Sequence, residues 1–278
     1  MKKLLIPAYA MALLTIGACS SSTKTEEHDS IPIVVNDTDS IPTDTIDSIA
    51  APDTLVAIHN IPFETKKMEK KKGDNELEIE YPVKGNEALV DSVRTWISRQ
   101  LGDSYKGDLN KPDAFFKHYY KKLGDEDMEE FGGYTVDKFE LEFTDDYIVT
   151  YEHSSFEFEG GEHGNGGEYG MTFLQSNGKA FSKKCINSYD ALTKLFIDGL
   201  KQYFKVKTDA QLTAKLRQGI NLSKLPAPAM TPWIDKEGIV FSYTPYEITS
   251  EPVQPKFTIP YSAIEPYLTD EGKQYFGK

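Results

Sequence analysis

Residues 139–178, FELEFTDDYIVTYEHSSFEFEGGEHGNGGEYGMTFLQSNG, carry the pattern that decides the fold. Apolar side chains recur at every second position over 139–143, 147–151 and 156–158. This period of two predicts strands with one buried face. A further short strand at 171–173 runs into Asn177-Gly178, a pair that favours a tight hairpin turn. The stretch therefore predicts an antiparallel β meander.

Helical patterns lie on both sides of this meander. Apolar residues at helical spacing predict one helix between Asn86 and Gly102 and another that begins near Pro112. After the meander, the same spacing returns behind Ser188, and Thr208 to Gln211 forms a capping box. Further strands are expected at 76–83 and in a hairpin that spans 233–243. The fold class is thus α+β: an antiparallel β meander packed with helices, in two sub-modules that share one sheet-and-helix body.

The N-terminus has the form of a bacterial export segment. Lys2 and Lys3 precede an apolar stretch, 4–15, that is too short to span a bilayer. Ile16-Gly17-Ala18-Cys19 then matches a lipobox, which predicts a lipoprotein signal peptide over 1–18 and lipid attachment (diacylglycerol and palmitate) at Cys19. The alternative is an ordinary secretory signal in which Cys19 is incidental. We expect an exported chain held to the membrane of the cell envelope through this lipid, and Ser20 favours the outer membrane over the inner.

An acidic tether is expected to follow the lipid. Over 19–60 Asp, Ser, Thr and Pro dominate, and Asp29-Ser30-Ile31-Pro32 recurs as Asp39-Ser40-Ile41-Pro42. Such a segment buries too little apolar area to offset the entropy of ordering, so we expect it to be disordered. The folded part is expected to comprise an N-terminal α+β module, 61–182, and a C-terminal module, 183–278.

Charge and cysteine content narrow the function classes. The chain carries 31 Lys and Arg against 44 Asp and Glu, a net charge of −13, so nucleic acid is a poor partner because its phosphates would be repelled. An acidic surface suits a basic partner, or simply solubility. With Cys19 lipidated, only Cys185 remains and no intramolecular disulfide can form. We expect Cys185 to be a buried apolar residue rather than a nucleophile.

The most unusual segment of the folded part is Gly160–Gly167, with five glycines in eight residues. Glu162 and His163 lie within it, and a carboxylate beside an imidazole can serve as an acid/base pair or as metal ligands. His153, one strand away, is a candidate to meet His163 across the hairpin. The helix-borne His-Glu-x-x-His spacing and a third ligand are missing. We therefore expect a structural or ligand-contact role, with no catalytic residue, metal or cofactor assigned. Sequence motifs for phosphate loops, dinucleotides and Cys-x-x-Cys redox sites are likewise absent.

Three segments together resemble one protein family. Gly160-Gly161-Glu162-His163-Gly164-Asn165, the run from Gly238 through Pro245-Tyr246-Glu247-Ile248, and Phe257-Thr258-Ile259-Pro260-Tyr261 are similar, in this order, to segments of RsiV-like proteins. These carry a C-terminal domain of unknown function, DUF3298, often preceded by a smaller partner domain. The chain departs from the family at Glu162, where a small residue is usual, and over 249–254, which lacks the usual Tyr and Gly.

The resemblance implies an extracytoplasmic binding or sensing module rather than an enzyme. One family member is the sensor of an anti-sigma factor that binds lysozyme, and others lie beside polysaccharide deacetylase domains. The candidate ligand contacts are Glu162, His163, Asn165, Tyr246 and Glu247. The expected ligand is a basic protein such as lysozyme or a cell-wall glycan such as peptidoglycan. The alternative is a hydrolase of envelope polysaccharides, or an accessory to one, that uses Glu162 and His163.

Overall fold

The structure is a computed structural model that describes residues 61–123 and 132–278. All of these residues belong to one compact unit, 52–278. The predicted signal peptide over 1–18, the lipid site at Cys19, the tether over 19–60 and the acidic run 125–130 lie outside the described residues.

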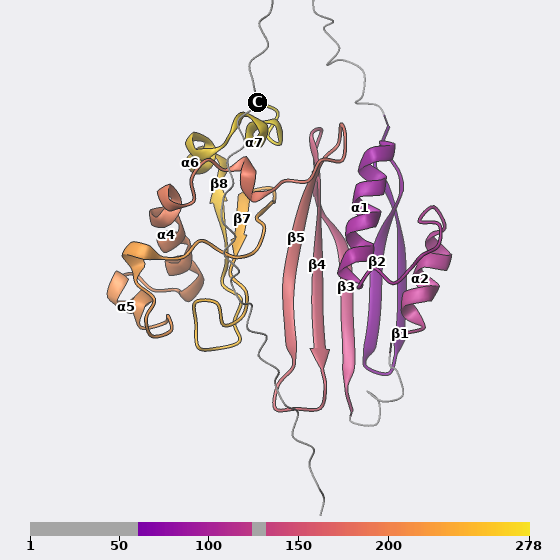
Figure 1. Ribbon diagram of the computed structural model, residues 1–278, viewed down its shortest axis with the longest axis horizontal. Coiled ribbons are helices and arrows are strands. Elements are labelled where there is room, and N and C mark those ends of the chain that lie inside the picture. Colours follow the sequence, from indigo (N-terminus) through magenta and orange to yellow (C-terminus); the bar gives the residue numbers. More distant parts are fainter. Residues whose placement is uncertain (1–60, 124–131) are drawn as a thin grey trace, which may run out of the picture. The chain divides into compact units, whose positions relative to one another are not determined.

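A five-stranded sheet, in the order β1-β2-β3-β4-β5, forms the larger half of this unit (Figure 1). Its strands are β1 (Glu64–Lys72), β2 (Asn75–Lys84), β3 (Tyr134–Thr144), β4 (Ile148–Phe158) and β5 (Asn165–Leu174). Every neighbouring pair is antiparallel except β2 and β3, which run parallel. The meander of β3, β4 and β5 confirms the pattern of 139–178, and the parallel pair is an addition to it.

Two helices connect β2 to β3 and pack on the sheet: α1 (Glu87–Gln100) and α2 (Pro112–Tyr120). As expected, the side chain of Asn86 caps α1 by accepting a hydrogen bond from the backbone N–H of Leu89 (3.3 Å), and Gly102 follows the helix in the left-handed region at φ +80°. The apolar face of α1 joins one hydrophobic cluster with the inner residues of the sheet. This cluster includes Leu77, Ile79, Tyr81, Phe115, Phe139, Val149, Tyr151 and Phe173.

The second sheet is a three-stranded antiparallel one made of β6 (Trp233–Ile234), β7 (Gly238–Ser242) and β8 (Lys256–Pro260). The helix α4 (Thr193–Phe204) packs on β8, and α5 (Asp209–Thr213) begins with the predicted capping box of Thr208 and Gln211. The remaining helices among the described residues are α6 (Tyr261–Ile264) and α7 (Asp270–Gln274), with 3-10 turns at Lys183–Cys185, Asp190–Leu192, Leu222–Lys224 and Glu265–Tyr267. Cys185 is fully buried, and burial raises the pKa of its thiol.

A closed cycle of hydrogen bonds joins the two sheets. The hydroxyl of Thr172 accepts from the backbone N–H of Ile234 (2.8 Å), the hydroxyl of Thr150 donates to the carbonyl oxygen of Ile234 (2.7 Å), and the two hydroxyls are 2.8 Å apart. Both threonines are fully buried. Beside this cycle, the ring of Trp233 lies against Gly170, where even a Cβ atom would come within 2.2 Å of it. The two halves thus share one body, and the α+β class is confirmed.

Both outer edges of the five-stranded sheet have distinctive chemistry. At one edge, β1 carries five lysines in nine residues, and only Met68 is buried. At the other, the side-chain amide of Gln254 accepts from the backbone N–H of Glu168 (2.8 Å) and donates to its carbonyl oxygen (2.7 Å). The amide of Gln254 thus occupies the hydrogen-bonding groups that the edge strand β5 would offer to a neighbour at Glu168.

Three local details differ from the sequence pattern. The strand β1 was not expected, because its run of charges has no apolar alternation. The two short strands expected at 147–151 and 156–158 are the single strand β4, since Ser154 and Ser155 pair with both neighbouring strands. The strand β5 begins inside the glycine-rich segment, at Asn165, so that only 159–164 form the turn. No helix in the described ranges is long and apolar enough to cross a membrane.

Candidate functional site

A cleft of about 410 Å³ lies where the ends of β3, β4 and β5 meet the segment after β7. Its volume falls in the range of about 300–1,000 Å³ that is usual for small-molecule sites. It is lined by Thr135, Asp137, Ser155, Phe156, Glu157, Gly164, Asn165, Gly166, Tyr169, Pro245, Tyr246 and Pro252. The cleft brings together two residues expected to contact a ligand, Asn165 and Tyr246, which are 81 positions apart in the chain.

Strand register arranges the floor of the cleft in cross-strand rows. Thr135, Glu157 and Asn165 form the first row, Asp137, Ser155 and Gly167 the second, and Phe139, His153 and Tyr169 the third. Because side chains alternate between the two faces of a sheet, rows two residues apart lie on one face. Along the strands, the side chains on this face change from the aromatic third row to the polar first and second rows. Hydrogen-bonding groups are therefore available beside an aromatic ring.

The glycines of this segment make room for aromatic rings. A Cβ atom on Gly164 would come within 2.3 Å of the ring of Phe156, and one on Gly167 within 3.0–3.2 Å of the ring and hydroxyl of Tyr169. Gly160 is the glycine of 160–167 whose backbone needs the left-handed region, at φ +85°. The segment is therefore rich in glycine chiefly because two rings lie directly on its backbone.

The cleft is also lined by the turn that presents Tyr246. Tyr246 has a backbone φ of +64°, which is costly for a residue with a side chain, and it is 44% exposed. The carboxylate of Glu247 holds this turn, since it accepts from the backbone N–H groups of Thr244 and Ala229 (2.8 Å each) and from the hydroxyl of Thr244 (3.1 Å). Both oxygens of Glu247 are engaged, so its part in the site is to position Tyr246.

The remaining expected contacts lie at the turn of 159–164, outside the residues that line the cleft. Glu162 and His163 are both exposed, and Nδ1 of His163 lies 3.3 Å from the carbonyl oxygen of Gly164. The expectation that His153 meets His163 is wrong, because His153 is on the floor of the sheet. Its ring stacks on Phe139 at 4.0 Å, and it is 4% exposed. The strand β4 ends five residues after His153, and the chain then enters the turn that holds His163. The two histidines are therefore kept apart.

Two carboxylates give the cleft its charge. Nε2 of His153 donates to Oδ1 of Asp137 (2.8 Å), which fixes the orientation of that carboxylate at the cleft floor. Glu157 lies in the neighbouring row. No lysine, arginine or histidine lines the cleft as the described residues form it. An anionic ligand would meet two negative charges with no compensating base, so the cleft suits a neutral or cationic ligand.

A group of three carboxylates with metal-ligand spacing, Glu69, Glu76 and Glu78, lies elsewhere, on β1 and β2. Glu76 pairs with Lys138 (3.0 Å) and Lys71 (3.1 Å), and Glu78 pairs with Lys67. The hydrogen bond from Lys138 lowers the pKa of Glu76. Since lysines already neutralise these carboxylates, the group is an ion-pair network that joins neighbouring strands.

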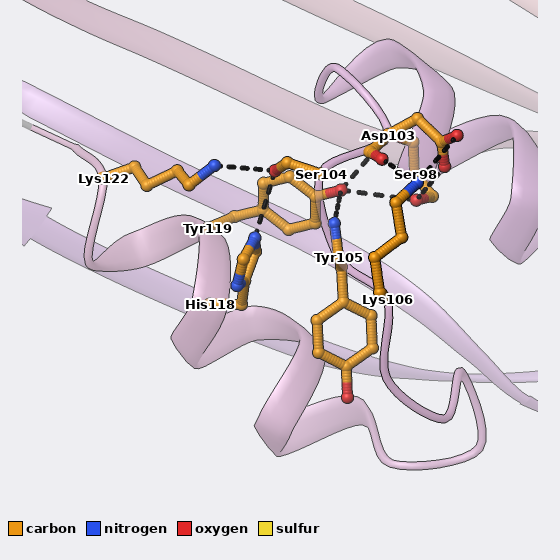
Figure 2. A network of polar contacts seen from close by, with 8 residues as sticks. All are labelled: Ser98, Asp103, Ser104, Tyr105, Lys106, His118, Tyr119 and Lys122. Carbon is orange, nitrogen blue, oxygen red and sulfur yellow. Dashed lines mark hydrogen bonds and ion pairs between the residues drawn. The ribbon is translucent and has the colours of Figure 1, made fainter.

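A second polar cluster contains residue types of a nucleophile and a base. Figure 2 shows the side chains of His118 and Lys122 converging on Ser104: Nε2 of His118 lies 3.0 Å from its Oγ, and Nζ of Lys122 donates to it (2.8 Å). The hydroxyl of Tyr119 accepts from the backbone N–H of Tyr105 (3.3 Å) and lies 3.3 Å from Oγ of Ser98. The described residues provide no hydrogen bond that would orient Nδ1 of His118 as a catalytic base requires. The cluster fastens the loop after α1 onto α2.

No family model matches the sequence, and no curated protein matches it. Two solved structures have a similar fold. One is a member of the DUF3298 family from Bacteroides fragilis NCTC 9343, with a TM-score of 0.60, 21% identity, and coverage of 80% of this chain and 99% of that one. The other is a DUF3298 family protein from Pseudomonas aeruginosa PAO1, with a TM-score of 0.52, 15% identity, and coverage of 77% and 97%. The described part of the chain thus has the fold of DUF3298 structures.

Proposed function

We propose that this chain is a lipoprotein of the RsiV-like type, anchored to the cell envelope, that acts as a non-enzymatic binding or sensing module through the cleft. The observation that carries the proposal is Tyr246, an exposed aromatic residue held in a strained backbone conformation at the cleft wall. Strained residues persist where the surrounding structure enforces them, and they cluster at functional sites. Here the carboxylate of Glu247 holds the turn in this conformation through its hydrogen bonds to the backbone.

The hydrolase alternative has weaker support. Glycosidases need two carboxyl groups that flank the scissile bond. Glu162 and His163, the pair that this alternative uses, are exposed and do not line the cleft. Of the two carboxylates that do line it, Asp137 and Glu157, Asp137 is hydrogen-bonded to His153.

Binding is tested with the mature chain and two probes, purified peptidoglycan sacculi by co-sedimentation and lysozyme by calorimetry at low ionic strength. We expect at least one probe to bind, and Tyr246→Gly to weaken that binding about tenfold or more. Glycine tolerates the backbone conformation of Tyr246, so the stability of this variant should hold or rise. Tyr203→Ala is the matched control, because Tyr203 is 37% exposed and lies outside the cleft. Binding of neither probe, or equal binding by both variants, would contradict the proposal.

A catalytic role has its own readout in the same assay. Release of soluble sugar from sacculi by the wild-type chain, lost in Glu162→Gln and in His163→Ala, would replace the binding proposal with the hydrolase alternative. We expect no such release.

The anchor is tested separately in living bacteria. With radiolabelled palmitate in the medium, we expect the full-length chain to incorporate label and Cys19→Ser to incorporate none. Cys185→Ser is the control and should label like the wild type, because Cys185 is fully buried. Label retained in Cys19→Ser, or a wild-type chain without label, would refute lipid attachment at Cys19.

A further inference from the structure

We infer that the ligand of the cleft is a neutral saccharide chain, which lies along the polar face of β3, β4 and β5 with sugar rings against Tyr169 and Tyr246. This inference rests on the proposed binding function and names the ligand class of the same site.

The aromatic surfaces come from separate parts of the chain. Tyr169 ends the third cross-strand row and lines the cleft, with its ring over Gly167 of the second row, where no side chain stands between the ring and the strand. Tyr246 lines the same cleft from the segment after β7. Phe156 also lines the cleft, yet its row with Val136 and Gly166 alternates with the polar rows, so its side chain belongs to the other face of the sheet and is not part of this surface. Sugar rings have apolar faces of C–H groups, and such faces pack against aromatic rings, which provide large rigid apolar surfaces.

The polar groups between the rings suit hydroxyl groups. Asp137 and Glu157 are acceptors, Thr135 and Ser155 both donate and accept, and the amide of Asn165 does both through separate atoms. In the first two rows these side chains follow one another at strand spacing. A ligand with hydroxyls at regular intervals along a chain can therefore pair with successive rows, whereas an apolar ligand would leave these groups without partners.

The orientation of Asp137 is prepared in advance. His153 donates to Oδ1 of Asp137, and its ring is fixed by stacking on Phe139. The second carboxylate oxygen remains for a ligand. His153 does not line the cleft, so it acts as a positioning residue through Asp137. A fixed acceptor costs less entropy on binding than a mobile one.

The charge of the cleft excludes anionic ligands. Its lining has two carboxylates and no basic side chain among the described residues. Phosphates, uronic acids and acidic peptides would be repelled. A basic protein could approach the acidic surface, yet the paired rings and the row of small polar groups match a chain of sugar rings better than a folded protein surface.

The test compares neutral and acidic glycans with the mature chain. On an array that holds both, we expect binding to neutral oligosaccharides of four or more sugars and none to uronic-acid oligomers of the same length. For the best neutral oligosaccharide, calorimetry should show a loss of about tenfold or more in Tyr169→Ala and in Tyr246→Gly, and retention in Tyr169→Phe. Asp137→Asn keeps one carbonyl acceptor and should lose a smaller factor. Tyr246→Gly serves where Tyr169→Ala fails to fold.

The outcomes separate this inference from the proposal beneath it. If no neutral glycan binds while lysozyme or sacculi bind in a Tyr246-dependent way, the binding module stands and the saccharide inference falls. Equal binding of neutral and acidic glycans, or neutral-glycan binding that survives both tyrosine variants, also overturns the inference. If nothing depends on the cleft in any assay, both fall together.

Discussion

Trp233→Ala is expected to lower the free energy of unfolding by about 3–5 kcal/mol, because it removes a large buried side chain at the junction of the two sheets. Trp233 is 1% exposed, and its ring lies directly on Gly170 of β5. No Cβ atom on Gly170 can fill the space, so alanine at 233 leaves a cavity between the sheets.

Urea denaturation of the mature chain, followed by circular dichroism, measures this effect. Val83→Ala is the control, since Val83 is 41% exposed on β2 and should change stability by no more than about 0.5 kcal/mol. A loss below about 1 kcal/mol for Trp233→Ala would mean that the three-stranded sheet does not depend on this contact for its attachment.

Thr172→Val is expected to cost about 1–3 kcal/mol, because it leaves a buried backbone donor without its acceptor. The hydroxyl of Thr172 accepts from the N–H of Ile234, and valine has nearly the same shape but no oxygen. Packing is thus almost unchanged, and the measured loss reports the hydrogen bond.

Thr172→Ser separates the hydroxyl from the methyl group. Serine keeps the acceptor for Ile234 and loses only a buried methyl, so it should be the more stable of the two variants. The same urea titration measures both. If valine proves as stable as threonine, the cycle of Thr150, Thr172 and Ile234 contributes nothing to the joint between the sheets, and the apolar contacts around Trp233 hold it alone.

Most of the fold could be predicted because local chemistry specifies its elements. Alternation marks β3, β4 and β5, Asn86 and Pro112 mark helix starts, and Gln211 completes a capping box. The parallel pairing of β2 with β3 was missed, although α1 and α2 separate these strands in the sequence and a helical connection between two strands favours a parallel pair. The strand β1 was not predicted from the sequence. It is stabilised by pairing with β2 and by ion pairs such as Lys71 with Glu76, and neither produces a local apolar pattern.

The candidate site was only partly accessible from the sequence. Asn165 and Tyr246 were expected as contacts, and both line the cleft. Asp137, Phe156 and Tyr169 were missed, since a sequence does not show which residues of three strands share a row. One signal was available: glycines at 164, 166 and 167 close to aromatic residues at strand spacing indicate rings that lie on the backbone.

The two edges of the five-stranded sheet affect whether copies of this protein associate through their strands at high local concentration. An exposed edge strand can recruit a strand from another molecule and propagate an intermolecular sheet. Here any incoming strand would meet the lysines of β1 at one edge and, at the other, the amide of Gln254 already bonded to Glu168. Lysine repulsion discourages the first route, and occupied backbone groups discourage the second. Together these two features disfavour strand-to-strand association between copies of this chain when molecules are crowded together.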